Sequence, residues 1–247
     1  MSIFQFKKFS VKQDNSSMKV GTDAVLLGCW TQLRKTDKQL LEVGTGCGVI
    51  SLIIAQRYNF VNIDAIDIDK ASILDAKDNF NYSPWNNRLS AINDSLQTYN
   101  PDKQYDIIVS NPPYFNNSLQ CPNNQRSVAR HTNTLSYNDL LSYSHKLLSI
   151  NGIFSVILPF EEGKEFINLA KQYHFSVNRI TKVYPTPTSM PKRLLIELQK
   201  NENILGTEKY INQSEKAYIE DILTIEISRH NYTEEYIGLT KEFYLKM

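Results

Sequence analysis

The stretch that most constrains the fold is residues 40–50, where a short apolar run leads into three alternate glycines and then into a helical pattern. Gly44, Gly46 and Gly48 allow a turn in which the backbone adopts positive φ and a ligand approaches main-chain N–H groups at the start of a helix. Their spacing differs from the Gly-x-Gly-x-x-Gly fingerprint of dinucleotide-binding enzymes, which disfavours a nicotinamide or flavin cofactor. The order strand, glycine turn, helix predicts the first unit of an alternating α/β domain.

An acidic residue follows at the distance expected of a ribose-binding acid. Residues 61–66 form a second apolar strand that ends at Asp67, about 20 residues after the glycines, where a carboxylate accepts hydrogen bonds from ribose hydroxyls. Asp69 suits the N-cap of a helix that begins near Lys70. Asp67 is therefore the better candidate for binding a ribose.

The tetrapeptide Asn111-Pro112-Pro113-Tyr114 comes directly after a third apolar run, residues 105–110, which has the pattern of a buried strand. Two prolines remove two backbone donors and fix φ, so the chain leaves the strand as a rigid segment with unpaired carbonyls. The Asn111 side-chain oxygen and the Pro112 carbonyl then accept hydrogen bonds from one planar amino group, while the Tyr114 ring offers a stacking face. Taken alone, the tetrapeptide also fits a plain strand-to-loop turn.

Strands and helices alternate through the rest of the chain, which predicts a doubly wound, mostly parallel α/β sheet. Residues 176–184 and 194–199 lack a helix between them, which predicts a hairpin and one antiparallel edge strand. Ligands of such sheets bind beyond the carboxyl ends of the strands. The glycine loop, Asp67, Asp94 and the tetrapeptide all lie at predicted strand ends, so we expect them to form one site.

Two segments flank this predicted core. Residues 1–20 have the pattern of an extended arm or short hairpin, ahead of a helix that Thr22 or Asp23 is expected to cap. The polar segment 116–134 is expected to form a mobile loop over the site, with disorder without function as the alternative.

Composition limits the number of domains and the kind of partner. A chain of 247 residues with 41% hydrophobic content buries one sizeable core, so we expect a single domain. A net charge of +1 means that an RNA-binding surface would have to be local. Three cysteines lack metal-ligand or disulfide spacing, and no apolar segment reaches membrane-spanning length. We expect a soluble, cytoplasmic protein that contacts no membrane, binds no metal ion, and is a monomer rather than an oligomer.

The order of these motifs resembles the class I S-adenosylmethionine-dependent methyltransferases, in the branch that methylates amino groups conjugated to a ring or a carbonyl. The core resemblance covers residues 40–198, and further matches extend it over nearly the whole chain. With them, the chain resembles the bacterial tRNA adenine-N6 methyltransferases that modify adenine 37, just 3′ of the anticodon of a valine tRNA. The further matches are residues 4–9, 18–27, 129–131, 192–193 and 240–245.

The resemblance implies a Rossmann-like class I methyltransferase sheet within one domain: an N-terminal arm and capping helix (1–39), a catalytic core (40–200) and a C-terminal extension (201–247). It implies methyl transfer from S-adenosylmethionine to N6 of adenine 37 in the anticodon stem-loop, with Asn111, Pro112 and Tyr114 as the catalytic residues. The implied cofactor-binding residues are Lys19, Thr22, Glu42, Gly44, Gly46, Gly48, Asp67, Ile68, Asp94, Ser95 and Asn111. The implied tRNA-binding residues are Tyr114, Arg130, His131, Lys192 and Arg193.

Other functions stay open at this stage. A glutamine side-chain amide in a protein partner presents the same geometry as adenine, but enzymes that methylate it carry a helical domain ahead of the glycine motif, and here only residues 1–43 precede Gly44. A DNA adenine methyltransferase would need a base-reading domain for which the chain has no spare residues. A non-catalytic module that binds S-adenosylmethionine or RNA would tolerate loss of the tetrapeptide, which is intact.

Overall fold

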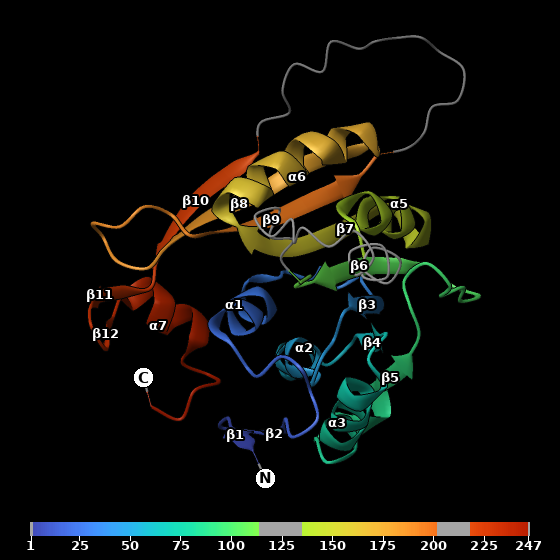
Figure 1. Ribbon diagram of the computed structural model, residues 1–247, viewed down its shortest axis with the longest axis horizontal. Coiled ribbons are helices and arrows are strands. Elements are labelled where there is room, and N and C mark those ends of the chain that lie inside the picture. Colours follow the sequence, from blue (N-terminus) through green and yellow to red (C-terminus); the bar gives the residue numbers. More distant parts are fainter. Residues whose placement is uncertain (1, 114–134, 202–217, 247) are drawn as a thin grey trace, which may run out of the picture.

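The computed structural model describes residues 2–113, 135–201 and 218–246. In these ranges an eight-stranded sheet runs through the molecule in the order β10-β8-β9-β7-β6-β3-β4-β5 (Figure 1). Every neighbouring pair is parallel except those that β9 makes with β7 and β8. The strands are β3 (Gln39–Val43), β4 (Asn62–Asp67), β5 (Leu89–Asn93), β6 (Tyr105–Ser110), β7 (Leu148–Pro159), β8 (Phe175–Tyr184), β9 (Arg193–Lys200) and β10 (Ile219–Thr224).

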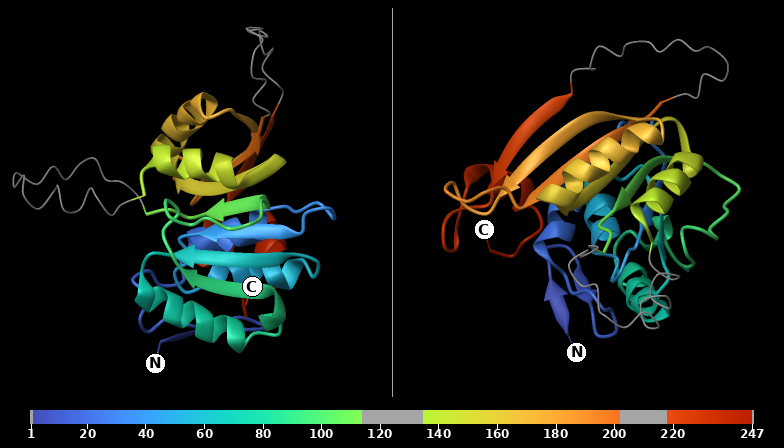
Figure 2. Two further views of the ribbon diagram at one scale, coloured as in Figure 1. Left: turned by 90° about the vertical axis from the view of Figure 1, so that its right-hand side faces the viewer. Right: turned by 45° about the horizontal axis from the view of Figure 1, so that its top comes forward.

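Helices cover both faces of the sheet, which confirms the predicted doubly wound architecture (Figure 2). Side chains of α1, α2, α3 and α7 join one hydrophobic core, and those of α5 and α6 join a second core on the opposite face. Strand β6 contributes to both, because Ile107 faces the first core and Ile108 the second. The helices are α1 (Thr22–Trp30), α2 (Val49–Arg57), α3 (Lys70–Asn81), α5 (Tyr137–Leu147), α6 (Phe160–Gln172) and α7 (Glu234–Thr240).

The predicted antiparallel strand is β9, and the predicted hairpin is β8 with β9. Strand β9 lies between β7 and β8, and β10 continues the sheet beyond β8 in parallel register. The antiparallel strand therefore lies towards one edge of the sheet, with two further strands outside it. The expected cap of α1 is wrong by one or two residues, because Gly21 occupies the N-cap position and makes no side-chain hydrogen bond.

The two ends of the chain lie side by side. The predicted N-terminal hairpin is present as β1 (Ile3–Gln5) and β2 (Ser10–Lys12). Phe6, fully buried, forms a β-bridge with Tyr244, and the Lys7 amide donates to the Phe243 carbonyl at 2.8 Å. The C-terminal segment also contains a small ribbon, β11 (Glu226–Ser228) and β12 (Asn231–Tyr232), ahead of α7. The first and last segments of the chain therefore pack against each other.

Candidate active site

The glycine loop adopts the positive φ values that its sequence predicts. Gly44, Gly46 and Gly48 have φ values of 73°, 54° and 84°. A Cβ atom on Gly48 would lie 2.5 Å from the Phe80 ring, so this glycine allows α2 to pack closely against α3. A Cβ atom on Gly44 or Gly46 would meet nothing within 4 Å. The first two glycines therefore leave an open face at the carboxyl end of β3, where a ligand can approach the backbone.

Asp67 ends β4 and holds the loop in place. Its Oδ2 accepts a hydrogen bond from the Gly46 amide at 2.8 Å, and its Oδ1 accepts one from the Asp69 amide at 2.9 Å. Each carboxylate oxygen keeps a further lone pair, which suits it to accept ribose hydroxyls. Burial raises the pKa of Asp67, although these amides favour its charged form. Asp69 caps α3 by accepting from the Ala71 and Ser72 amides, which confirms its predicted role.

Glu42 lies fully buried beneath the loop. Its Oε2 accepts hydrogen bonds from the Ser51 amide, at 3.0 Å, and from the Ser51 hydroxyl. Burial raises the pKa of Glu42 to about 7, and hydrogen bonds from the side chains of Ser51 and Thr45 oppose that rise. A buried carboxyl group therefore lies directly beneath the glycine loop, in contact with the loop residue Thr45.

The elevated pKa of Glu42 is expected to make the protein less stable as pH rises. The ordinary value is 4.5, so between that value and about 7 the folded state holds a proton that the unfolded chain has lost. The free energy of unfolding should fall across this window by up to about 3 kcal/mol, and Glu42→Gln should remove that fall. Denaturant unfolding of both ligand-free proteins at pH 5 and pH 8 measures the effect. Equal decreases in the two proteins would contradict it.

The ends of β4 and β5 meet beside Asp67. The Asp94 amide donates to the Asp67 carbonyl at 3.2 Å. Oδ1 of Asp94 accepts from the Ser95 amide at 2.8 Å and from the Thr98 hydroxyl at 2.5 Å, while no described residue donates to its Oδ2. Ile68, 60% exposed, offers an apolar surface next to these acceptors. An exposed apolar side chain beside a free carboxylate oxygen suits a planar ring that bears an amino group.

Asn111 follows the end of β6, the strand next to β3. Ser110 pairs with Val43 in the parallel register, and its hydroxyl donates to the Val43 carbonyl at 2.9 Å. Asn111 therefore leaves the sheet beside the start of the glycine loop, half-buried, and is followed by a buried Pro112 and an exposed Pro113. Tyr114, Arg130, His131 and the segment 116–134 lie outside the described residues.

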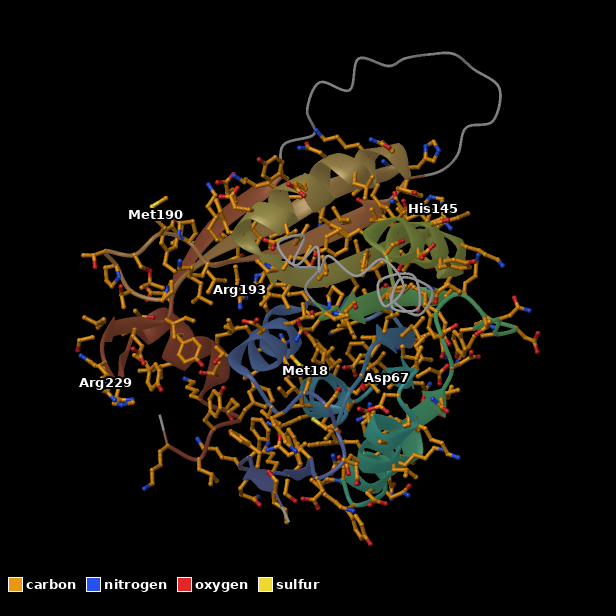
Figure 3. All side chains as sticks on the ribbon, viewed as in Figure 1. Met18, Asp67, His145, Met190, Arg193 and Arg229 are labelled. Atoms are coloured by element: carbon orange, nitrogen blue, oxygen red, sulfur yellow. The ribbon has the colours of Figure 1, made fainter. Side chains whose placement is uncertain are left out.

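Arg193 lies at the same edge of the sheet, but its guanidinium is already engaged. Arg193 begins β9 opposite Pro159, the last residue of β7. Its Nε donates to Asp23 at 2.8 Å, in the first turn of α1, and its Nη1 donates to the Lys192 carbonyl at 2.9 Å. Figure 3 shows Arg193 above α1 and Asp67 at the end of β4. Lys192 is exposed, so of this pair the lysine is better placed to contact a phosphate.

The N-terminal arm is attached to the glycine loop by α3, which the sequence analysis missed. Fully buried Asp75 accepts hydrogen bonds from the amides of Asn15 and Ser16, both at 2.8 Å. Asn79, one helical turn later, donates to the carbonyls of Lys12 and Cys47, both at 2.8 Å. The signal available in the sequence is the i, i+4 spacing of Asp75 and Asn79 among the apolar positions Ile73, Ala76 and Phe80 of the same helix.

The remaining predicted cofactor residues lie where this arm meets α1. Lys19 is exposed, and its Nζ donates to the Gln13 carbonyl. Thr22 is the exposed first residue of α1. Within the described part of the chain, neither side chain makes a hydrogen bond to the glycine loop. Asp67, Asp94, Asn111 and the glycines, by contrast, meet at the ends of neighbouring strands.

Comparison with known proteins defines the class. The family model described as the methyltransferase small domain matches residues 16–157. A predicted O-methyltransferase from Agrobacterium tumefaciens has a similar structure, with a TM-score of 0.65 at 17% identity over 90% of this chain and 96% of that one. TYW2 from Pyrococcus horikoshii, in complex with MeSAdo, has a TM-score of 0.56 at 15% identity over 80% of this chain and 70% of that one. The fold is that of the class I methyltransferases.

Closer relatives define the family. A protein from Parabacteroides distasonis named tRNA1(Val) (adenine(37)-N6)-methyltransferase is 46% identical over 99% of this chain and 98% of its own length. A protein of the same name from Flavobacterium psychrophilum is 42% identical over 99% of this chain and all of its own length. The chain belongs to the tRNA1(Val) (adenine(37)-N6)-methyltransferase family.

Two further observations concern partners. Within the described ranges, no group of three or more His, Cys, Asp or Glu side chains is arranged to hold a metal ion. No helix in the same ranges is long and apolar enough to cross a membrane.

Proposed function

We propose that this protein transfers a methyl group from S-adenosylmethionine to N6 of adenine 37 in the anticodon loop of tRNA1(Val). The observation that carries the proposal is the position of Asn111-Pro112-Pro113 beside the glycine loop, in a chain that matches enzymes of that name over its full length. We further propose that the protein acts in the cytoplasm as a monomer, as one methyltransferase domain over residues 1–247, and without a metal ion.

The cofactor site follows from the residues at the carboxyl edge of the sheet. The open backbone at Gly44 and Gly46 accommodates the methionyl part, and the Asp67 carboxylate accepts the ribose hydroxyls. Oδ2 of Asp94, beside exposed Ile68, accepts the adenine amino group of the cofactor. When bound there, S-adenosylmethionine supplies a methyl group that its sulfonium already activates.

The catalytic task of the chain is then to orient a weak nucleophile. The lone pair of the adenine amino group is delocalised into the ring, so this nitrogen reacts poorly unless it is held and pyramidalised. The Asn111 oxygen and the Pro112 carbonyl accept hydrogen bonds from its two N–H groups, which stabilises the positive charge that develops on nitrogen as the N–C bond forms. The sulfur would leave as the neutral thioether of S-adenosylhomocysteine, and the methylated nitrogen would release one proton to water, so no dedicated base is needed. Tyr114, outside the described residues, is proposed as the platform on which the flipped adenine stacks. Alignment of nitrogen, methyl and sulfur supplies several of the ~7 to 11 kcal/mol available from proximity.

Mass spectrometry of nucleosides tests the proposal. Bulk tRNA from cells that lack the gene should lose N6-methyladenosine, and the purified protein with labelled cofactor should restore it at adenine 37. Methyl groups found only in protein would reject the adenine assignment in favour of glutamine methylation. Cofactor binding without any transfer would favour a non-catalytic module.

Substitution of Lys192 is expected to weaken tRNA binding without affecting the cofactor. We propose that Arg130, His131, Lys192 and Arg193 form the phosphate track, with Arg193 fixed in place by Asp23. Lys192→Ala should lower tRNA affinity and reduce the slope of log K against log salt by about 0.9 or less, the value of one phosphate contact. Lys77→Ala, an exposed lysine on α3, serves as the matched control. An unchanged salt slope for Lys192→Ala would remove this residue from the track.

A further inference from the structure

A cavity of about 360 Å³ lies between the N-terminal arm, the first turn of α1 and the C-terminal segment. Phe4 of β1, Thr22 of α1 and Tyr244 near the chain end contribute to its wall. None of the residues that hold the cofactor in the proposed reaction lines it. Thr22, which the sequence analysis expected at the cofactor, lies in the wall of this cavity. The cavity is therefore a separate site whose ligand is unassigned.

Four aromatic side chains line this cavity: Phe4, Tyr232, Tyr236 and Tyr244. The rings of Tyr232 and Tyr236 lie 5.2 Å apart between centroids, and those of Phe4 and Tyr244 lie 6.3 Å apart, edge to face. Tyr236 is buried and anchors the group, whereas Tyr232 and Phe4 are only half-buried. Partly exposed aromatic faces around a cavity are the platforms on which single-stranded nucleic acids stack unpaired bases.

The polar groups of the cavity suit a nucleotide as well. Glu226 lies in the wall, and the hydrogen bond that its Oε1 accepts from the His230 amide is long, at 3.4 Å. The carboxylate can therefore also accept a hydrogen bond from an amino or imino group of a base. Lys246 lies at the wall and is exposed. Arg229, exposed in the turn between β11 and β12, projects from the same C-terminal segment (Figure 3). The cavity thus combines stacking faces, one acceptor and nearby cations for phosphate.

The cavity and the proposed reaction site are connected through the first turn of α1. Thr22 in its wall is followed by Asp23, which is ion-paired to Arg193 at the start of β9. Strand β9 is two strands from β6, the strand that presents Asn111, and two strand spacings amount to about 10 Å. A loop that delivers a flipped base to Asn111 would therefore pass its neighbouring nucleotides over α1 towards the cavity.

We propose that this cavity holds a second unstacked base of the tRNA anticodon loop, a nucleotide that flanks the one methylated. The inference rests on the proposed tRNA methylation and adds to it a specificity subsite, formed by residues that are distant in sequence from the glycine loop. The base would stack on the half-buried Tyr232 and donate a hydrogen bond to Glu226. These contacts would select the anticodon loops in which adenine 37 reaches the reaction site.

The test combines one substitution with a scan of abasic nucleotides. Anticodon stem-loop RNAs, each with one abasic loop position other than the target, are methylated by the wild type and by Tyr232→Ala under conditions where kcat/KM for RNA is measured. For the wild type, kcat/KM should fall roughly 5- to 150-fold when the abasic site is at one particular loop position, and Tyr232→Ala should lower kcat/KM on intact RNA by a similar factor. When Tyr232→Ala acts on the RNA that is abasic at that position, kcat/KM should fall no further, because the base and the ring on which it stacks act together.

Controls separate the possible failures. Tyr232→Phe keeps the ring and should behave as the wild type, and Tyr82→Ala removes a tyrosine that is 89% exposed at the end of α3 and should have no effect. Cofactor affinity and thermal unfolding of each variant show whether the fold is retained. The subsite would be overturned if the decreases in kcat/KM from the abasic nucleotide and from Tyr232→Ala multiplied at every loop position. It would also be overturned if Tyr232→Ala left kcat/KM unchanged. Absence of methylation by the wild type on every RNA would instead overturn the proposed function.

Discussion

Asn111→Ala is expected to lower the rate of methyl transfer by about 100-fold or more while S-adenosylmethionine still binds, because removing one preorganised group that stabilises transition-state charge costs this much in other enzymes. Asn111 leaves β6 beside the glycine loop, whereas Asp67 and Asp94, the proposed cofactor acceptors, lie at the ends of other strands. The proposed Asn111 oxygen contact strengthens only when charge develops on the adenine nitrogen. Its loss should therefore appear in the chemical step.

Single-turnover methylation, run beside calorimetry with the cofactor, measures the two quantities separately. Asn86→Ala is the matched control, since Asn86 is an exposed asparagine in the short helix before β5. Turnover near that of the wild type would contradict the acceptor role of Asn111. A parallel loss of cofactor affinity would indicate that Asn111 acts through the cofactor site instead.

Asp67→Ala is expected to weaken S-adenosylmethionine binding by ~1.5 to 3 kcal/mol, the range for hydrogen bonds to a charged group, with tRNA affinity little changed. The substitution removes the acceptor of the ribose hydroxyls and also the partner of the Gly46 amide. Asp69→Ala provides a control two residues away, because it removes the cap of α3 and should cost stability without a matching loss of cofactor affinity. Calorimetry with each ligand measures both variants. Equal losses of cofactor and tRNA affinity for Asp67→Ala would mean that Asp67 supports the fold.

Local patterns sufficed for much of the fold. The strand, glycine turn and helix around residues 40–50, the cap at Asp69 and the β8–β9 hairpin are each encoded within a short window, so the sequence predicts them. Strand β10 is different, since most of its side chains are exposed and its parallel partner β8 lies about 40 positions earlier in the chain. Its residues show no alternation that would reveal a half-buried strand, and no local signal specifies a parallel pairing.

Local and long-range features differ in the same way at the candidate site. The position of the glycines, Asp67 and Asn111 at one edge of the sheet is predictable, because each lies at the end of a strand whose pattern is visible in a short window. The partner of Arg193 was not, because Asp23 lies 170 positions away and the ion pair depends on how α1 packs beside β9. Likewise, nothing in the arm itself indicates that Asp75 and Asn79 hold it. Such contacts are consequences of tertiary packing.

The contacts of Asn79 give the arm a second property. One side chain bonds both to the backbone of Lys12 and to the Cys47 carbonyl in the glycine loop, so docking of the arm and ordering of the loop are linked equilibria. If docking of the arm strengthens binding of a ligand to the ordered loop, then binding of that ligand stabilises the docked arm by the same coupling free energy. Amide hydrogens of residues 10–16 should therefore exchange with solvent more slowly when S-adenosylmethionine is bound, which makes the first hairpin of the chain a reporter of cofactor occupancy.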